Sequence, residues 1–423
     1  MRVVIIGNGV TGISAALRLR KNRPDAQITV ISGESKYHYS RPALMYIFMG
    51  HMRYPETKPF EDRHWERERI DLVRDWIVGI DTDGRTLHGH SGTHYEYDAL
   101  LLATGSKPNK FGWPGQDLDG VQGLWGLQDL HTLYETVKRT QHAVIVGGGL
   151  IGIELAEMVH SRGIDVTFLV REESYWDNVL PKEESNIINE LIREAGMTLH
   201  LQTELKEIVS DGHGSAIGVV TNRDERIECQ LVGLTAGVSP NVDLVRETSI
   251  AVGRGILVDR AFRTETPGVF AAGDCAEIVT PGEARNWIQQ VWYTGKRQGE
   301  LAADSICEQP VEYDPGIWFN SAKFLDLEYQ TYGQVNFRVP GEQNIYWQHE
   351  DRRHAVRIVH VDGVAIGFNL IGIRWRHEVC ERWLAERRTV DYVLDHLADA
   401  HFDPEFYTRY QNEITHELRG QLR

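Results

Sequence analysis

Two glycine-rich turns contain the residues whose types and spacing most clearly indicate chemistry. Gly7, Gly9 and Gly12 lie in "VVIIGNGVTGISAA" at residues 3–16, and the spacing recurs in "AVIVGGGLIGIELA" at residues 143–156, as Gly147, Gly149 and Gly152. In this pattern the first glycine turns the chain, the second lets the backbone approach a pyrophosphate, and the third packs the helix on the strand. Each turn predicts a dinucleotide site; the alternative is a glycine-rich turn without a ligand.

Three charged side chains occupy positions at which a dinucleotide site can use a charged residue. Glu34 follows the strand after the first turn, where a carboxylate can accept hydrogen bonds from both ribose hydroxyls. Arg171 follows the strand after the second turn and favours a 2′-phosphate, but Glu172 and Glu173 come next, and an exposed loop arginine is the alternative. Asp274 ends an apolar strand, where it would point into the ligand crevice; the alternative is a helix N-cap.

The elements that must position these residues follow from hydrophobic periodicity. Each turn lies between an apolar strand and a helix, and further strands are predicted at residues 26–32, 97–109, 164–170 and 264–277. From about residue 311 the pattern changes to antiparallel strands with glycine turns, followed by one or two helices. The predicted fold class is α/β, with two doubly wound Rossmann-like dinucleotide-binding domains and an α+β C-terminal module.

Composition excludes several other classes. The 423 residues are 41% hydrophobic, enough for two or three domains, and the formal net charge of −16 argues against nucleic acid and anionic membranes as partners. We find no signal peptide, no apolar run long enough for a membrane span and no spacing typical of metal ligands. Four scattered cysteines favour a soluble cytoplasmic protein with reduced thiols.

Four motifs in order now resemble a known family. They are GxGxxG with Glu34, the Ala-Thr-Gly of residues 103–105, the second glycine turn with Glu154, and "TETPGVFAAGD" at residues 264–274. Over about residues 1–310 the chain resembles the FAD-dependent pyridine nucleotide-disulfide oxidoreductase superfamily. "SRPAL" at residues 40–44 makes it most similar to the ferredoxin, rubredoxin and nitrite reductase-like flavoproteins.

The resemblance implies a role for each motif. The first turn would bind FAD, with Glu34 at the adenosine ribose, Ile77 at the adenine, and Asp274 at the ribityl chain, while Thr104 and Gly105 return the chain past the flavin. The second turn would bind NADH or NADPH, with a slight preference for NADPH from Arg171, and Glu154 would sit near the nicotinamide ring as the catalytic residue. The expected cofactor-binding set is completed by Arg41, Pro42, Gly237, Gly273, Trp287 and Ile288.

The chain also departs from its relatives. The region "HYSRPALMYIF" lacks the cysteines with which disulfide reductases and peroxidases of the superfamily react, so disulfide reduction is not expected. Met45-Tyr46 replaces a Ser-Lys whose lysine partners the glutamate equivalent to Glu154, and Trp125-Gly126 replaces an arginine near the flavin. The aromatic segment 283–300 is expected to run beside the flavin ring, with helix packing on the sheet as the alternative.

The resemblance implies an FAD-dependent NAD(P)H oxidoreductase that passes electrons to a small iron–sulfur protein, of the ferredoxin or rubredoxin kind. The alternatives are an NAD(P)H oxidase or quinone reductase, and a cofactor-bound signalling or scaffold protein like apoptosis-inducing factor. We expect an FAD domain at residues 1–111 and 240–310, a nicotinamide domain at 112–239 and a C-terminal domain at 311–423. The C-terminal domain would close over the flavin side or form a homodimer contact. Its clustered cations, at residues 352–354, 374–377 and 387–388, could attract an acidic partner, and a solvated surface of mixed charge is the alternative.

Overall fold

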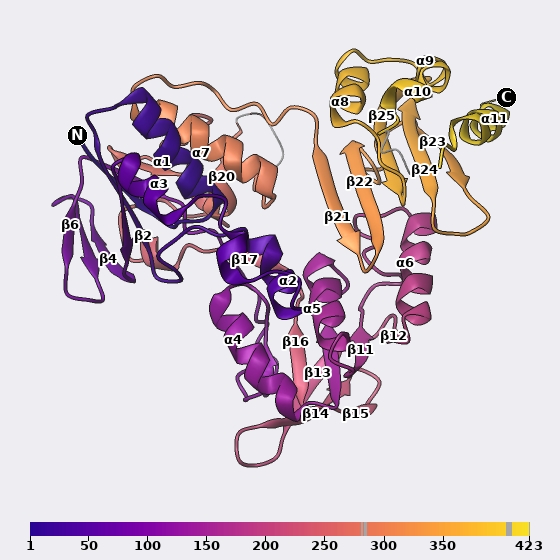
Figure 1. The fold of residues 1–423 in the computed structure, drawn as a ribbon, viewed down its shortest axis with the longest axis horizontal. Helices are drawn as coiled ribbons and strands as arrows, with labels where there is room; N and C mark the ends of the chain where they lie inside the picture. The colour runs from indigo at the N-terminus through magenta and orange to yellow at the C-terminus, as the bar shows by residue number, and fades with distance from the viewer. Residues whose placement is uncertain (281, 283–285, 403–407, 423) are drawn as a thin grey trace. The chain divides into compact units, whose positions relative to one another are not determined.

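The computed structural model describes residues 1–280, 282, 286–402 and 408–422. The chain divides into two compact units (Figure 1). The first comprises Met1–Phe111, Gln122–Arg139 and Gly237–Asp314, and the second comprises Gly112–Val121, Thr140–Ala236 and Pro315–Arg423. The three domains with the boundaries given above stay a prediction. Residues 283–285 of the predicted aromatic segment lie outside the described residues.

The first unit is built on a parallel five-stranded sheet of order β19-β7-β1-β2-β3. Its strands are β1 (Arg2–Ile6), β2 (Gln27–Ser32), β3 (Ile70–Arg74), β7 (Ala99–Leu102) and β19 (Val269–Ala271). β1 pairs in parallel with both β2 and β7, so it is the central strand. Its carboxyl end therefore lies in the middle of the row of strand ends on that side of the sheet. Because both faces of β1 and β7 are covered, Val3–Ile6 and Ala99–Leu102 form continuous buried apolar runs rather than alternating ones.

Two helices beside this sheet pack closely against each other because the residues at their contact are small. α1 (Val10–Asn22) and α7 (Trp292–Ile306) lie side by side (Figure 1). A Cβ atom on Gly299 would lie 2.2 Å from the carbonyl oxygen of Thr11, and one on Gly295 would lie 3.0 Å from the Thr11 hydroxyl. Ala302 and Ala303 of α7 are fully buried. The contact therefore holds the start of α1 firmly over the carboxyl end of β1.

The remaining elements of the first unit surround this layer. A three-stranded antiparallel sheet consists of β4 (Ile77–Asp81), β5 (Thr86–Gly89) and β6 (His94–Glu96). Two-stranded pairs join β8 (Ser106–Pro108) to β17 (Val238–Pro240) and β18 (Ile256–Val258) to β20 (Ala276–Ile278). The other helices are α2 (Leu44–Phe48), α3 (Asp62–Arg67) and α4 (Leu127–Thr136), with short 3₁₀ turns η1 (Arg41–Ala43) and η5 (Gly273–Cys275).

The second unit repeats the strand–turn–helix plan on its own sheet, of order β12-β11-β10-β16-β9. Its strands are β9 (Val121–Gln122), β10 (His142–Val146), β11 (Asp165–Leu169), β12 (Thr198–His200) and β16 (Leu231–Leu234). α5 (Leu150–His160) follows β10, and α6 (Lys182–Glu194) precedes β12. An antiparallel sheet of β13 (Leu205–Ser210), β14 (Ala216–Thr221) and β15 (Arg226–Glu228) accompanies it.

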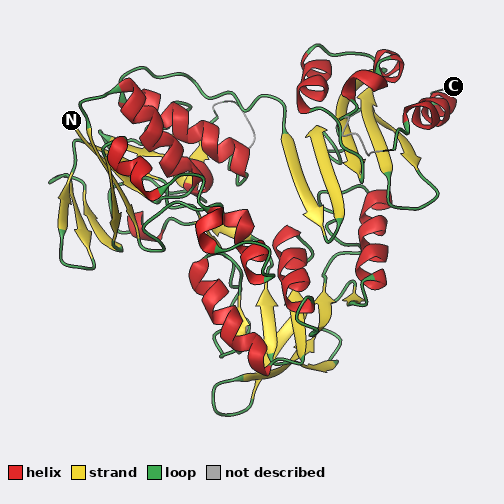
Figure 2. Ribbon diagram, viewed as in Figure 1, coloured by secondary structure: helices red, strands yellow, loops and turns green. Residues whose placement is uncertain are grey.

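The C-terminal part of the second unit is an antiparallel sheet with helices, as Figure 2 shows by colour. The sheet has the order β21-β22-β25-β24-β23, from β21 (Phe319–Phe324), β22 (Leu327–Gly333), β23 (Glu342–Gln348), β24 (Ala355–Val361) and β25 (Val364–Ile371). The helices are α8 (His377–Ala385), α9 (Val390–Asp395), α10 (Leu397–Ala400) and α11 (Gln411–Gln421). Fully buried Trp347, Phe368 and Trp383 lie in its separate core.

A buried ion pair joins this antiparallel sheet to α6. Arg357 of β24 donates from Nε and Nη2 to the two carboxylate oxygens of Glu184, at 2.8 Å each, and from Nη2 to Glu183 at 2.7 Å. The Glu184 side chain is 1% exposed and that of Arg357 is 7% exposed. The two parallel sheets and the α+β module confirm the predicted fold class. Among the described residues, we find no helix with the length and apolar character that crossing a bilayer requires.

Candidate functional site

The first glycine turn leaves no room for side chains at two of its three glycines. Gly7 has a φ of +108°, and a Cβ atom there would lie 2.1 Å from the carbonyl oxygen of Ala103. A Cβ atom on Gly12 would lie 2.0 Å from the carbonyl oxygen of Gly7. Glycine is therefore required at both positions by the turn and by the packing of α1 on β1 and β7.

Gly9 differs because a Cβ atom there would meet no atom of the described residues within 4 Å. Gly9 is the N-cap of α1, and no side chain caps that helix. The first backbone N–H groups of a helix have no partner within it, and the helix dipole favours negative charge at this end. The space above Gly9 thus fits an anionic pyrophosphate, with backbone N–H groups as the donors.

Glu34 lies in a local network that holds it ionised. It accepts hydrogen bonds from Tyr39, from the Arg41 guanidinium at 2.6 Å, and from the backbone N–H of Leu127 at 3.0 Å. Burial opposes the charge on Glu34, but the charge of Arg41 and these hydrogen bonds keep its pKa below the usual value. Arg41 also donates to the carbonyl oxygen of Trp125. Tyr39 and Leu127 were not predicted from sequence. Trp125 was noted there as replacing an arginine near the flavin, but not as a partner of Arg41, because it joins the network from a distant segment.

Asp274 caps no helix, so the alternative interpretation from sequence is wrong. It lies inside η5, whose N-cap is Ala272, and α7 begins later with Val291 as its N-cap. The Ser106 hydroxyl donates to the Asp274 carboxylate at 2.9 Å and accepts from the Gln290 amide at 2.7 Å. Burial raises the pKa of Asp274, against the opposing effects of Ser106 and Arg41.

The backbone next to Asp274 is also fixed by a side chain. The Gly273 N–H donates to the Gln298 amide oxygen on α7, at 2.9 Å. Ser106, Gln290 and Gln298 are residues that sequence reasoning missed, because nothing in their local sequence indicates that they surround Asp274. Gly273, with a φ of +78°, lies against Thr11 of α1, so Asp274 and the first glycine turn are brought to the same end of the sheet.

Hydrogen bonds join the segment around Thr104 to the segment that follows Gly237. The Thr104 hydroxyl donates to the carbonyl oxygen of Asn241 at 2.6 Å, and the Asn241 N–H donates to the carbonyl oxygen of Gly105 at 2.8 Å. Gly105 and Gly237 have φ values of +72° and +84°. These turns bring β8 and β17 together as an antiparallel pair within the first unit.

The other predicted residues of the first unit occupy varied positions. Ile77 is buried at the start of β4, and Pro42 is the second residue of η1. Trp287 pairs with Ile278 through two backbone hydrogen bonds and packs near Arg260, and Ile288 is half-buried beside it. In the aromatic segment, α7 begins only at Trp292, so Trp287 and Ile288 precede the helix rather than belong to it.

The second glycine turn reproduces the geometry of the first. Gly147 has a φ of +123°, and its Cβ atom would lie 2.7 Å from the carbonyl oxygen of Thr235. A Cβ atom on Gly152 would lie 2.9 Å from the Thr235 hydroxyl, whereas one on Gly149 would meet nothing within 4 Å. The uncapped N-terminus of α5 at Gly149 therefore fits a second pyrophosphate. Tyr175, missed by sequence reasoning, donates to the carbonyl oxygen of Gly149 at 2.8 Å.

Arg171 follows β11 and lies on the surface. Its side chain is 71% exposed, and the guanidinium donates to the Glu172 carboxylate at 2.9 Å. Glu172, which weakens the prediction of a 2′-phosphate site from sequence, is thus the ion-pair partner of Arg171. A ribose phosphate that binds Arg171 has to compete with this surface ion pair, which is itself weak.

Glu154 lies on α5, two residues after Gly152. Burial raises its pKa to about 7, and the nearby charge of Glu157 acts in the same direction. Near neutral pH the carboxyl group is therefore partly protonated, so it can hold or release a proton beside the second glycine turn.

We expect the Glu154→Gln variant to be more stable than the parent protein at pH 8 but not at pH 4.5. The native pKa of Glu154 is raised, so the native state holds this proton more tightly than the unfolded state, and stability falls as pH rises from about 4.5 to about 7. The shift corresponds to about 3 kcal/mol at most. Urea unfolding at both pH values measures the difference. Glu135→Gln, at an exposed helical position, is the control and should show none.

All four cysteines are buried and reduced. Burial raises the pKa of the Cys229 thiol to about 12 and raises the pKa values of Cys275, Cys307 and Cys380. Because the thiolate is the nucleophile, these thiols are poorly suited to attack a disulfide or peroxide. Cys275, next to Asp274, is fully buried and is part of the apolar core of the first unit.

Comparisons with known proteins agree with this geometry. A family model described as "Pyridine nucleotide-disulphide oxidoreductase" matches residues 1–299. The chain is 32% identical to rhodocoxin reductase of Rhodococcus erythropolis, over 77% of this chain and 76% of that protein. It is 28% identical to an NADH oxidase of Methanocaldococcus jannaschii, over 80% and 77%. A crystal structure of a ferredoxin reductase from Rhodopseudomonas palustris superimposes with a TM-score of 0.80 at 25% identity, covering 88% of this chain and 91% of that one.

Proposed function

The chain belongs to the pyridine nucleotide-disulphide oxidoreductase family, and we propose that it is an FAD-dependent NAD(P)H oxidoreductase that passes electrons to a small iron–sulfur protein. The observation that carries the proposal is the repeated turn: Gly9 and Gly149 each leave open space at an uncapped helix N-terminus, one in each compact unit. A bound flavin accepts two electrons from a reduced nicotinamide and can release them singly.

The residues of this chain bind and orient the two cofactors. In the first unit, the turn at Gly9 holds the FAD pyrophosphate, and Glu34, kept ionised by Arg41, accepts hydrogen bonds from the ribose. Asp274, oriented by Ser106, binds the ribityl chain. In the second unit, the turn at Gly149 holds the nicotinamide cofactor, and Glu154 carries the proton that titrates near neutral pH.

We propose an external protein as the acceptor, since the described residues provide no thiol suited to relay electrons. The cysteines are buried and their pKa values are raised, which disfavours thiol chemistry. By their names, rhodocoxin reductase acts on rhodocoxin and the ferredoxin reductase acts on a ferredoxin. The arginine clusters that sequence reasoning offered for docking lend little support, because Arg352, Arg353 and Arg374 pair with Glu190, Glu194 and Glu328. A homodimer through the C-terminal domain stays a prediction.

The function is tested by anaerobic titration of the purified yellow protein. We expect reduced nicotinamide to bleach the flavin, and the reduced protein to pass electrons to an oxidised ferredoxin or rubredoxin, followed by the absorbance of the iron–sulfur centre. Rapid reduction of the flavin without transfer to any iron–sulfur protein, together with fast oxygen uptake in air, would instead favour the oxidase function. The similarity to the NADH oxidase makes that the second candidate.

We propose a slight preference for NADPH, and this proposal rests on Arg171 alone. We expect Arg171→Glu to weaken the binding of NADPH about tenfold or more and that of NADH far less, because only NADPH brings a 2′-phosphate to this position. Parallel titrations with both nucleotides measure the two affinities. Arg226→Glu, an equal charge change at another exposed position in the second unit, is the control. Equal losses for both nucleotides would contradict the preference.

A further inference from the structure

The hairpin between β23 and β24 brings three metal-ligating side chains together. His349 follows the last residue of β23 and His354 precedes the first residue of β24, and the His349 N–H donates to the carbonyl oxygen of His354 at 2.9 Å. Asp351 lies within this closed loop. One ligand atom from each of His349, Asp351 and His354 lies within 4.8 Å of the others.

The loop orients the Asp351 carboxylate toward both imidazoles. One oxygen, Oδ1, accepts the backbone N–H of Arg353 at 2.8 Å. The other, Oδ2, lies 3.0 Å from Nδ1 of His349 and 2.7 Å from Nδ1 of His354. The carboxylate is therefore held by the backbone on one side, and its second oxygen is left facing two ring nitrogens.

We propose that His349, Asp351 and His354 form a binding site for a divalent transition metal ion, with Zn²⁺ as the best-suited ion. Imidazole nitrogen and carboxylate oxygen are common ligands of zinc, at bond lengths of about 2.0–2.2 Å. Tetrahedral binding places ligand atoms roughly 3.4 Å apart, so the three atoms need only small side-chain rotations to surround an ion. Three protein ligands leave a fourth position for water or another small ligand.

Hydrogen bonding alone accounts for this arrangement less well. The backbone N–H of Asp351 donates to Nδ1 of His349, at 3.2 Å, which requires a lone pair on that nitrogen. Nδ1 of a neutral imidazole carries either a proton or a lone pair. With a lone pair, Nδ1 cannot donate to the Asp351 carboxylate oxygen 3.0 Å away, and with a proton it cannot accept the Asp351 N–H, so neither neutral tautomer satisfies both contacts. A metal ion would take the Nδ1 lone pair of His349 in place of the Asp351 N–H, and His349, Asp351 and His354 would then share one cation.

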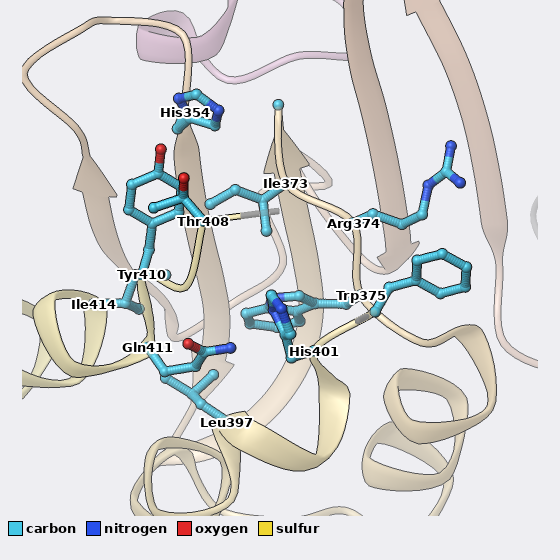
Figure 3. Close-up of a pocket in the computed structure, with 12 residues that line it drawn as sticks. His354, Ile373, Arg374, Trp375, Leu397, His401, Thr408, Tyr410, Gln411 and Ile414 are labelled. Atoms are coloured by element: carbon cyan, nitrogen blue, oxygen red, sulfur yellow. The ribbon is translucent and has the colours of Figure 1, made fainter. Parts of the chain in front are cut away.

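The surroundings are compatible with a cation. The two arginines in the loop are paired elsewhere, Arg352 with Glu190 and Arg353 with Glu194, both on α6. The Tyr410 ring lies 5.1 Å from the His349 ring and 5.0 Å from the His354 ring, and it shields one side of the cluster. His354 also lines a cavity of about 250 Å³ (Figure 3).

The test uses the FAD-containing full-length protein after treatment with a chelator, with Co²⁺ as the probe. We expect one Co²⁺ per chain, detected by a visible absorption band of low-coordinate cobalt and by calorimetry, and we expect Zn²⁺ to displace it. We expect Co²⁺ binding to weaken about tenfold or more in each of the variants His349→Gln, Asp351→Asn and His354→Gln. Losing a hydrogen bond that supports a metal ligand already lowers metal affinity about tenfold, and losing the ligand itself lowers it further.

Two controls separate loss of the site from loss of the fold. His213→Gln, at an exposed loop position elsewhere in the second unit, should bind Co²⁺ as the parent protein does. Each variant should keep its flavin and its unfolding temperature without metal, since the three residues lie on a surface hairpin. The proposal is overturned if the parent protein binds no Co²⁺ stoichiometrically, or if the folded triad variants bind it as tightly as the parent.

Discussion

Gly9→Leu is expected to fold normally but to lose its FAD, while Gly149→Leu stays yellow and is no longer reduced by NADH or NADPH. A Cβ atom at either glycine meets no atom of the described residues within 4 Å, so a side chain can leave the backbone at both positions without a collision. Gly9 and Gly149 have φ values of −66° and −128°, which leucine adopts without strain. The leucine side chain then fills the space that a pyrophosphate needs.

The two variants serve as controls for each other. Flavin content, read from the absorbance of the purified protein, should fall more than about tenfold in Gly9→Leu and not in Gly149→Leu, a difference of about 1.4 kcal/mol or more in binding. Nucleotide titration then measures the second site in Gly149→Leu. Gly7→Leu should instead disturb the fold, because its Cβ atom would collide with Ala103. Full flavin content in Gly9→Leu would contradict the assignment of the first turn.

Arg357→Met is expected to lower the stability of the protein by about 3–5 kcal/mol. The variant leaves Glu184, 1% exposed, without the cation that donates to both of its carboxylate oxygens. Asn369 would remain as a donor to Glu184, at 3.1 Å, but it carries no charge. A buried carboxylate without a cation is costly, whereas the pair itself contributes little over an apolar contact.

Urea unfolding of parent and variants measures this effect. The double variant Arg357→Met/Glu184→Leu should regain most of the lost stability, because no buried charge is left unpaired. Arg388→Met, which removes the arginine of an exposed pair with Glu386, is the matched control and should change stability by about 1 kcal/mol or less. An equal effect of Arg357→Met and Arg388→Met would show that the buried pair does not hold the antiparallel sheet to α6.

The sequence by itself determined what depends on the local backbone. The glycine spacing predicts both turns because a positive φ at Gly7 and Gly147, and close strand–helix packing at Gly12, are requirements of a single strand–turn–helix unit. The parallel strands and the antiparallel C-terminal sheet follow from runs and alternations of apolar residues over a few positions. These signals act within about a dozen residues, so no knowledge of distant segments was needed.

Only the tertiary structure decided which distant groups meet. Leu127 donates to Glu34 across 93 residues of chain, and Ser106 donates to Asp274 across 168. Arg352 and Arg353, which sequence reasoning offered to a partner, are paired with glutamates of α6. Side-chain charge and hydrogen bonding act over a few ångströms in space, whereas sequence patterns report neighbours along the chain, so these partners become visible only when the fold brings them together.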